Sequence, residues 1–295
     1  MTKDFLTTVR QKTIIFDGAM GTMLMEAGQA SSKSPLRLNV EQPALVTDIH
    51  RRYYAAGADV VITNTFGGNP LKLAADGLEK QMQQLNRQGV MLARRACPDG
   101  KFVAGDIGPC GKMLAPLGDI TAEAMEHNFF LQAEILIDSG VDLIIVETMY
   151  SLEEAVLAVK GVKRAGDIPL LASMTFTQTK NGFFTMMGES VTQCSTALEK
   201  AGADMLGANC TLNSRDFIEL TKALRAATRK PILIQPNAGK PVTRQGATYY
   251  AQSASDFAAD ALKIKAAGAD MLGGCCGTTP EFIQALKAGI AASTV

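Results

Sequence analysis

One short unit occurs four times in this sequence, and the repeat constrains the fold more than any other feature. Each copy ends a helical stretch with Gly, adds a small residue and Asp, and continues as an apolar run that closes on a polar residue. The copies lie at 56–64, 139–147, 201–209 and 267–275. Because the apolar runs do not alternate and each follows a Gly that can end a helix, they are typical of strands buried on both faces of a parallel sheet.

Four further apolar runs fit before or between these units, at 13–17, 102–106, 170–174 and 232–235. The total is therefore eight predicted strands. With 295 residues and 47% hydrophobic content, the chain can bury the core of one large barrel or of two ordinary domains. No Gly/Ser-rich or charged linker divides it, so we expect a single domain over residues 1–295.

Amphipathic segments with helix start signals separate the predicted strands. Pro43 suits a first helical turn, Ser151 and Glu154 have the spacing of a capping box, and Thr279-Pro280-Glu281 predicts a cap, a first-turn proline and an acidic residue together. Eight strand–helix units in one chain favour a (β/α)8 TIM barrel. A doubly wound open sheet is the alternative.

Polar or metal-binding residues stand where the predicted strands end. They are Asp17, Asn64, Asp106, Glu147, Thr175, Cys210, Asn237 and Cys275. In a barrel these positions share one rim, which is where active sites lie. Taken singly, Asp17, Asn64 and Asp106 also suit turns or loop caps. Glu147 closes a very apolar run, where an unpaired carboxylate is costly, so we expect it to meet a cationic partner and to contact substrate.

The cysteines at 275 and 276 indicate a metal site. They lie in Gly273-Gly-Cys-Cys-Gly277, and neighbouring cysteines are poor disulfide partners because the ring they close is strained. Cys210, at the end of another predicted strand, is the best candidate for a third ligand. Three thiolates with one open position are typical of a catalytic zinc. The alternative is that Cys275 and Cys276 are small buried apolar residues.

Composition excludes several classes of function. Lys plus Arg equals Asp plus Glu at 29 each, there is no Trp, and no basic cluster occurs, so nucleic-acid binding is not indicated. The start of the chain lacks a signal-peptide core, and no run of about 18 apolar residues indicates a membrane span. Six dispersed cysteines do not form a disulfide framework. We therefore expect a cytoplasmic protein.

Six motifs together resemble the homocysteine S-methyltransferase family, over about residues 14–290. They are Phe16-Asp-Gly-Ala-Met-Gly-Thr22, Thr63-Asn-Thr-Phe66, Glu147-Thr148, Gly207-Ala-Asn-Cys210, Pro236-Asn-Ala-Gly239 and Gly273-Gly-Cys-Cys-Gly277. Within that family the chain is most similar to the homocysteine-binding module at the start of cobalamin-dependent methionine synthases. Betaine- and S-methylmethionine-using enzymes resemble it less.

The resemblance implies a (β/α)8 barrel with zinc on Cys210, Cys275 and Cys276. It also implies that the amino-acid end of homocysteine is held at four matching positions, Asp17, Gly18, Ala19 and Glu147. Asn64 and Asn237, which lie in two of the shared motifs, complete the expected substrate contacts. One departure is the segment 211–214, where the family pattern has Gly-Pro soon after the first cysteine. This difference concerns the loop beside the metal rather than the metal itself.

These features predict formation of methionine by attack of a zinc-bound homocysteine thiolate on a methyl donor. The expected donor is methylcobalamin derived from methyltetrahydrofolate, carried on a separate corrinoid protein or domain. S-Methylmethionine or betaine as donor, another thiol or selenol as acceptor, and a non-catalytic zinc module that only presents a thiol are the alternatives. The long segment 180–188 either covers the substrate or packs on the barrel top.

Overall fold

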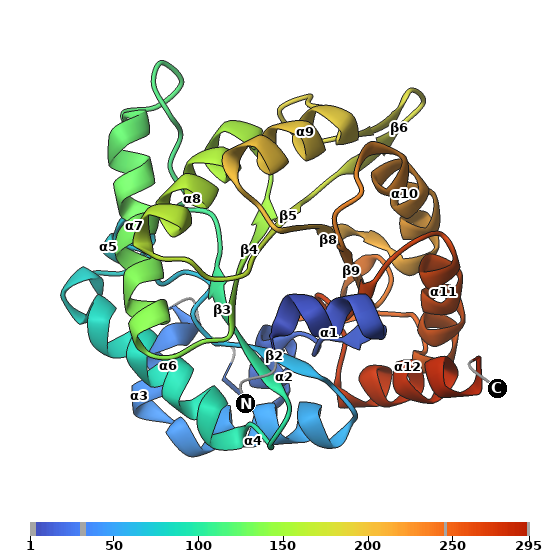
Figure 1. Ribbon diagram of the computed structural model, residues 1–295. Helices are drawn as coiled ribbons and strands as arrows, with labels where there is room; N and C mark the ends of the chain where they lie inside the picture. The colour runs from blue at the N-terminus through green and yellow to red at the C-terminus, as the bar shows by residue number, and fades with distance from the viewer. Residues whose placement is uncertain (1–3, 30–33, 245–246, 294–295) are drawn as a thin grey trace.

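Eight parallel strands form a closed barrel in the computed structural model, which describes residues 4–29, 34–244 and 247–293 (Figure 1). The strands are β1 (Ile14–Ile15), β2 (Val60–Ile62), β3 (Phe102–Ile107), β4 (Leu143–Met149), β5 (Leu170–Met174), β8 (Met205–Asn213), β9 (Ile232–Asn237) and β12 (Met271–Leu272). Their order is β1-β12-β9-β8-β5-β4-β3-β2. A parallel bridge between Phe16 and Val60 joins the two ends of this order. The predicted (β/α)8 barrel is therefore confirmed, and the open sheet was wrong.

Large apolar side chains fill the barrel interior. Phe16, Leu143, Met205 and other residues from the strands form one buried cluster. The short helix α1 (Phe5–Gln11) contributes Phe5, whose ring centroid lies 5.0 Å from that of Phe102. In Figure 1 this helix crosses the barrel opening that faces the viewer. Because α1 closes the amino-terminal end, the carboxyl ends of the strands form the accessible rim.

Helices surround the barrel and bury a second, larger apolar layer against the outside of the strands. They are α2 (Met20–Glu26), α3 (Leu38–Glu41), α4 (Pro43–Ala55), α5 (Pro70–Ala74), α6 (Met82–Ala96), α7 (Ala122–Asp138), α8 (Leu152–Ala165), α9 (Val191–Ala201), α10 (Ser214–Ala227), α11 (Ala254–Ala266) and α12 (Pro280–Ala292). Two antiparallel hairpins, β6 (Thr177–Thr179) with β7 (Gly182–Phe184) and β10 (Pro241–Arg244) with β11 (Ala247–Tyr250), extend the loops after β5 and β9. None of the helices in the described part of the chain has the length and apolar character that a membrane crossing requires.

The helices begin where the sequence predicted, but two of the predicted N-terminal caps differ from those in the structure. Pro43 and Pro280 occupy first turns as expected. Ser151 caps α8 by accepting from the Glu154 amide at 3.4 Å. The Glu154 carboxylate, however, accepts from the Cys110 amide at 2.7 Å, so the predicted reciprocal capping box was wrong. Thr279 is the N-cap residue of α12 but makes no side-chain cap bond, and the Phe282 amide donates instead to the Thr279 carbonyl at 3.0 Å.

The Asp of each repeated unit ties neighbouring strands together at the amino-terminal end. Its Oδ2 accepts the backbone N–H at the start of the preceding barrel strand in all four copies. The pairs are Asp59 with Ile15 (3.1 Å), Asp142 with Val103 (2.7 Å), Asp204 with Leu170 (3.0 Å) and Asp270 with Ile232 (2.8 Å). Each of these aspartates also pairs with a Lys or Arg side chain. The repeat in the sequence is thus a repeated link between strands.

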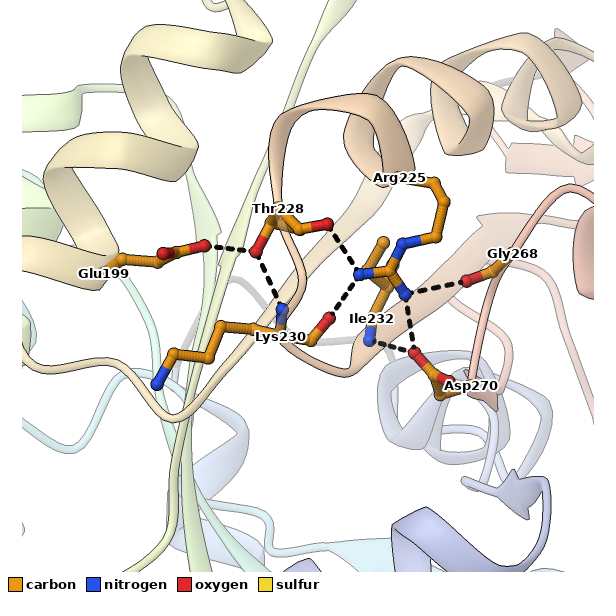
Figure 2. Close-up of polar contacts among 7 residues, drawn as sticks. All are labelled: Glu199, Arg225, Thr228, Lys230, Ile232, Gly268 and Asp270. Carbon is orange, nitrogen blue, oxygen red and sulfur yellow. Dashed lines mark hydrogen bonds and ion pairs between the residues drawn. The ribbon is translucent and has the colours of Figure 1, made fainter.

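The fourth copy of this link is shown in Figure 2. The Arg225 guanidinium donates to Asp270 Oδ2 at 3.2 Å and also to the carbonyls of Thr228 and Lys230, both at 2.8 Å. The same arginine reaches the Gly268 carbonyl at 3.4 Å. These contacts lie at the barrel end opposite the accessible rim, so they stabilise the fold and leave the rim free for chemistry.

Candidate active site

Three cysteine side chains converge at the rim. Cys210 lies within β8, and Cys275 with Cys276 lies in the loop that follows β12. Their sulfur atoms all lie within 4.8 Å of one another, and the Cys275 and Cys276 sulfurs are 4.0 Å apart. Thiolates on one tetrahedral zinc, with Zn–S bonds of about 2.3 Å, are separated by about 3.8 Å. The trio therefore fits three corners of a tetrahedral site and leaves the fourth corner free.

Two glycines let the cysteine loop pass close to its neighbours. A Cβ at Gly273 would lie 2.8 Å from Phe16 Cβ, and one at Gly274 would lie 2.3 Å from Thr278 Oγ1. The loop is then held by the Cys275 amide, which donates to the Pro236 carbonyl at 2.8 Å. Any larger residue at 273 or 274 would push the cysteine pair away from Cys210.

The backbone at the first cysteine is strained. Cys210 has φ 62° and Thr211 has φ 59°, in the left-handed region that costs non-glycine residues about 1–3 kcal/mol each. Thr211 Oγ1 donates to the Phe176 carbonyl at 2.8 Å, and Asn213 caps α10 through the Asp216 amide at 3.1 Å. Segment 211–214, which departs from the family pattern, thus extends β8 directly into α10.

The thiols share negative charge unequally. Hydrogen bonds from Cys275 and then Cys276 lower the pKa of Cys210 to about 3, and the Asn237 side chain also lowers it. The hydrogen bond with Cys210 is the main reason why the pKa of Cys275 is raised and that of Cys276 is raised to about 11. Cys210 is therefore the first of the three to become a thiolate, which is the form that binds metal.

The cysteines face a cavity of about 620 Å³ at the carboxyl ends of the strands. Gly18 and Ala19 line it from the loop after β1, Asn64 from the loop after β2, and Asp106 and Glu147 from β3 and β4. This volume is in the range of small-molecule sites. With Cys210 from β8 and Gln235 from β9, six strand ends and the cysteine loop contribute to one hollow, as the predicted convergence at the rim required.

Three carboxyl groups gather in this part of the barrel without a cation. Asp17 Oδ2 accepts from the Ile62 amide at 2.9 Å, while Asp17 Oδ1 and Asp106 Oδ1 are buried without a hydrogen-bond partner. Burial, and then the charge of Glu147, raises the pKa of Asp106 well above its usual value. Burial, and then the charge of Cys210, raises the pKa of Glu147 to about 7. None of the ion pairs among residues 4–29, 34–244 and 247–293 involves these three acids, so they are arranged for a cationic ligand.

Asp106 lines the cavity, although the sequence did not single it out as a substrate contact. As a strand-end residue before Ile-Gly-Pro it also suited a loop cap, and it was left out of the predicted substrate contacts. In the structure Asp106 is 5% exposed and lines the cavity, and its Oδ1 makes no hydrogen bond that would cap a loop. Its place at a strand end, which it shares with Asp17 and Glu147, was the signal that could have identified it.

The predicted asparagines are placed differently from one another. Asn64 lines the cavity, but its Nδ2 already donates to the Pro35 carbonyl at 3.0 Å and to Asn39 Oδ1 at 2.9 Å. It therefore braces the loop that carries it. Asn237 is 3% exposed, has no hydrogen-bond partner at Oδ1, and lowers the pKa of Cys210. It therefore lies on the thiol side of the site.

Segment 180–188 does not line the cysteine cavity among the residues described there. Its first half supplies the turn and the second strand, β7, of the β6–β7 hairpin, and Phe183 packs against the main core. Met186 is 76% exposed, while Met187 borders a separate hollow of about 100 Å³ with Met113 and Leu117. Phe183 thus packs as one alternative expected, the two methionines remain exposed, and no residue of 180–188 lines the cavity.

The fold and site define a (β/α)8 barrel with a three-thiol centre at the carboxyl ends of its strands. The profile of the homocysteine S-methyltransferase family matches residues 14–290. The chain therefore belongs to the homocysteine S-methyltransferase family and is a methyltransferase, as the motifs predicted.

Individual relatives agree with this assignment. The chain is 34% identical to a methionine synthase from Mycobacterium leprae and 35% identical to one from Mycobacterium tuberculosis, over 98% of its own length. It spans only about 25% of the length of either synthase. It is 29% identical to the homocysteine S-methyltransferase YbgG of Bacillus subtilis over 93% of both chains. The metallated form of the Escherichia coli homocysteine methyltransferase MmuM superimposes with a TM-score of 0.79 at 28% identity, covering 96% of this chain and 98% of MmuM.

Proposed function

We propose that residues 1–295 form a homocysteine-binding barrel domain that methylates homocysteine to methionine in a zinc-dependent reaction. The observation that carries the proposal is the meeting of two unlike sites at one cavity. Three convergent thiols face the carboxyl-bearing residues Asp106 and Glu147, and Asp17 is buried directly before the lining residue Gly18. None of these three acids takes part in an ion pair among the described residues. Homocysteine carries a thiol at one end and an ammonium group at the other. A free zinc corner and an acidic pocket match these two groups.

Cys210, Cys275 and Cys276 would hold the zinc. When bound there, the ion lowers the pKa of a thiol in its open position and keeps the substrate sulfur as a nucleophile. Asp17, Asp106 and Glu147 would hold the substrate ammonium, and the backbone at Gly18 and Ala19 faces the same cavity. Asn64 would support this pocket through its loop, and Asn237 would act beside Cys210.

No protein base is needed at the sulfur in this scheme. His50 lies in α4 and is completely buried, and burial lowers its pKa to about 3, so it stays neutral. His127 lies in α7 against Arg164 and the Phe130 ring. Both histidines lie in helices, and neither lines the cysteine cavity, which supports a structural role for them. In the transfer itself the sulfur lone pair forms the new bond to the methyl carbon while the bond between that carbon and the donor breaks.

We further propose that the donor is methylcobalamin, with its methyl group derived from methyltetrahydrofolate, carried on a separate corrinoid protein or domain. The support is the similarity to two methionine synthases of which this chain spans about a quarter. The cavity also opens at the rim, where a large partner can approach. The six free cysteines fit a reducing compartment, and we place the protein in the cytoplasm.

The second candidate is a barrel that uses S-methylmethionine or betaine without a corrinoid partner. YbgG and MmuM favour it, because the match covers 93% and 98% of their chains and a barrel of this size is nearly the whole of each protein. A non-catalytic zinc module that presents a thiol to a partner is a third candidate, and it differs from the first two only in lacking turnover.

A donor comparison tests these candidates. The zinc-loaded protein is incubated with homocysteine and either methylcobalamin, S-methylmethionine or betaine, and methionine is quantified by mass spectrometry. We expect turnover with methylcobalamin and loss of it in Cys210→Ala. Turnover with S-methylmethionine or betaine alone would overturn the donor assignment, and zinc binding without turnover on any donor would support the presenting module.

A further inference from the structure

The side chain of Asn209 connects the two halves of the site. Asn209 precedes Cys210 in β8 and is 1% exposed. It contacts residues of β4, of β5 and of the cysteine loop after β12.

All four hydrogen-bonding positions of this amide are occupied. Asn209 Oδ1 accepts from the Thr148 backbone amide at 3.0 Å and from Ser173 Oγ at 2.8 Å. Asn209 Nδ2 donates to Thr148 Oγ1 at 2.7 Å and to Cys275 Sγ at 3.9 Å. Because a backbone amide can only donate, the Thr148 contact sets which end of the Asn209 amide is oxygen. The nitrogen is therefore directed at the Cys275 sulfur.

The Thr148 contact matters because that residue is strained and lies next to the acidic pocket. Thr148 has φ 61°, a conformation that β-branched residues rarely adopt. It directly follows Glu147, so contacts that hold Thr148 also hold the backbone that carries the Glu147 side chain. Asn209 holds this turn at both the backbone and the hydroxyl.

We propose that Asn209 is a positioning residue that couples the thiol centre to the ammonium pocket. Its Nδ2 orients the Cys275 sulfur as a metal ligand, since an N–H donor to a ligand atom fixes the direction of that atom. Its contacts to Thr148 keep Glu147 in place. This inference rests on the proposed zinc-dependent function, and it adds that metal affinity and substrate affinity depend on one side chain that touches neither zinc nor homocysteine.

Asn209→Asp separates the two contacts of this residue. A carboxylate still accepts from the Thr148 amide and from Ser173, but it replaces the donor at Cys275 with a negative charge. We expect zinc affinity, measured by competition with a chelator, to fall by about 10- to 100-fold. In the cobalt-substituted protein the sulfur-to-cobalt absorption band is expected to shift. Asn209→Leu removes all four bonds, and we expect it also to raise the KM for homocysteine.

Asn128→Asp is the matched control. Asn128 is a similarly buried amide, 3% exposed, whose Oδ1 accepts from the Leu71 amide at 2.9 Å, and its contacts lie away from the cysteines. It should keep zinc affinity and the cobalt band within about twofold of the parent. Thermal unfolding of every variant shows which ones are folded, and Asn209→Ser takes the place of an Asn209 variant that is not.

The outcomes separate the inference from the proposed function. If the parent protein binds no zinc or cobalt, the proposed function fails. If the parent binds metal and a folded Asn209→Asp variant has the parental affinity and band, the inference is overturned. Equal losses in Asn209→Asp and Asn128→Asp would also overturn it, because the effect would then belong to any buried amide.

Discussion

Replacing Glu147 by Gln tests the ammonium pocket, because it removes the charge and keeps the shape. The carboxyl group lines the cavity and has a pKa raised to about 7 by burial. A hydrogen bond to a charged partner contributes about 1.5–3 kcal/mol. At about 1.4 kcal/mol per factor of ten, Glu147→Gln should weaken homocysteine binding by about 10- to 150-fold at pH 8 while zinc content stays at the parental level.

The pH dependence of this effect has a defined sign. Since the pKa of Glu147 is about 7, the carboxyl is mostly protonated at pH 6 and cannot pair with an ammonium. The ratio of parental to variant affinity should therefore rise as pH increases through 7 and level off above 8. The substrate thiol titrates alike in both proteins, so it cancels in the ratio.

The same substitution should stabilise the ligand-free fold. The pKa of this carboxyl rises from its ordinary 4.5 to about 7 on folding. The free energy of unfolding of the protein therefore falls as pH rises between these values, by at most about 3 kcal/mol. Glu147→Gln removes this loss, so its advantage in thermal unfolding should appear above pH 5 and be absent below pH 4. Calorimetric titration and unfolding scans measure both effects, with the exposed Glu153→Gln as control. Parental homocysteine affinity in Glu147→Gln at pH 8 would refute the reasoning.

Three further predictions concern other parts of the molecule. Asp106→Asn should raise the KM for homocysteine without releasing zinc, and an unchanged KM would remove Asp106 from the pocket. Alanine at any one of the three clustered cysteines should reduce zinc from one per chain to none in elemental analysis with the barrel still folded, whereas Cys194→Ala, in α9, should keep it. Asp59→Asn should lower the free energy of unfolding in urea at pH 7 by about 1–3 kcal/mol, because Asp59 is 5% exposed and pairs with two lysines. Asp270→Asn should lower it by less than about 1 kcal/mol, because Asp270 is 38% exposed. Equal costs at the two aspartates would contradict this ranking.

The strands were predictable from the sequence because four of them follow a local signal, a Gly that ends a helix and then an apolar run, and the other four are apolar runs that fit before or between those units. The Asp in each repeat was also visible in the sequence, but its role as a link between neighbouring strands was not. Asp59 accepts from Ile15 and pairs with Lys12 and Lys101, which are more than 40 positions away in either direction. Local patterns do not carry such contacts, so only the closed barrel shows what the repeated Asp does.

In the site, too, the features that follow from local patterns were predictable, and those that depend on distant contacts were not. Cys210, Cys275 and Cys276 lie together as expected, because parallel strands end at one rim. The features that the sequence did not show depend on distant partners. The Glu154 carboxylate accepts from the Cys110 amide instead of completing its capping box, and the Asn64 side chain, which lines the cavity, also donates to Pro35 and Asn39. A polar side chain at a strand end can face the cavity or brace a loop, and the choice is made by residues far away in the sequence.

X-ray absorption at the zinc edge tests the central claim most directly, because it reports the atoms bound to the metal. The zinc-loaded protein is measured alone and with saturating homocysteine. We predict three sulfur ligands and one lighter ligand in the first spectrum, and four sulfur ligands in the second. An unchanged ligand set with homocysteine bound would contradict activation of the substrate thiol by a metal on Cys210, Cys275 and Cys276.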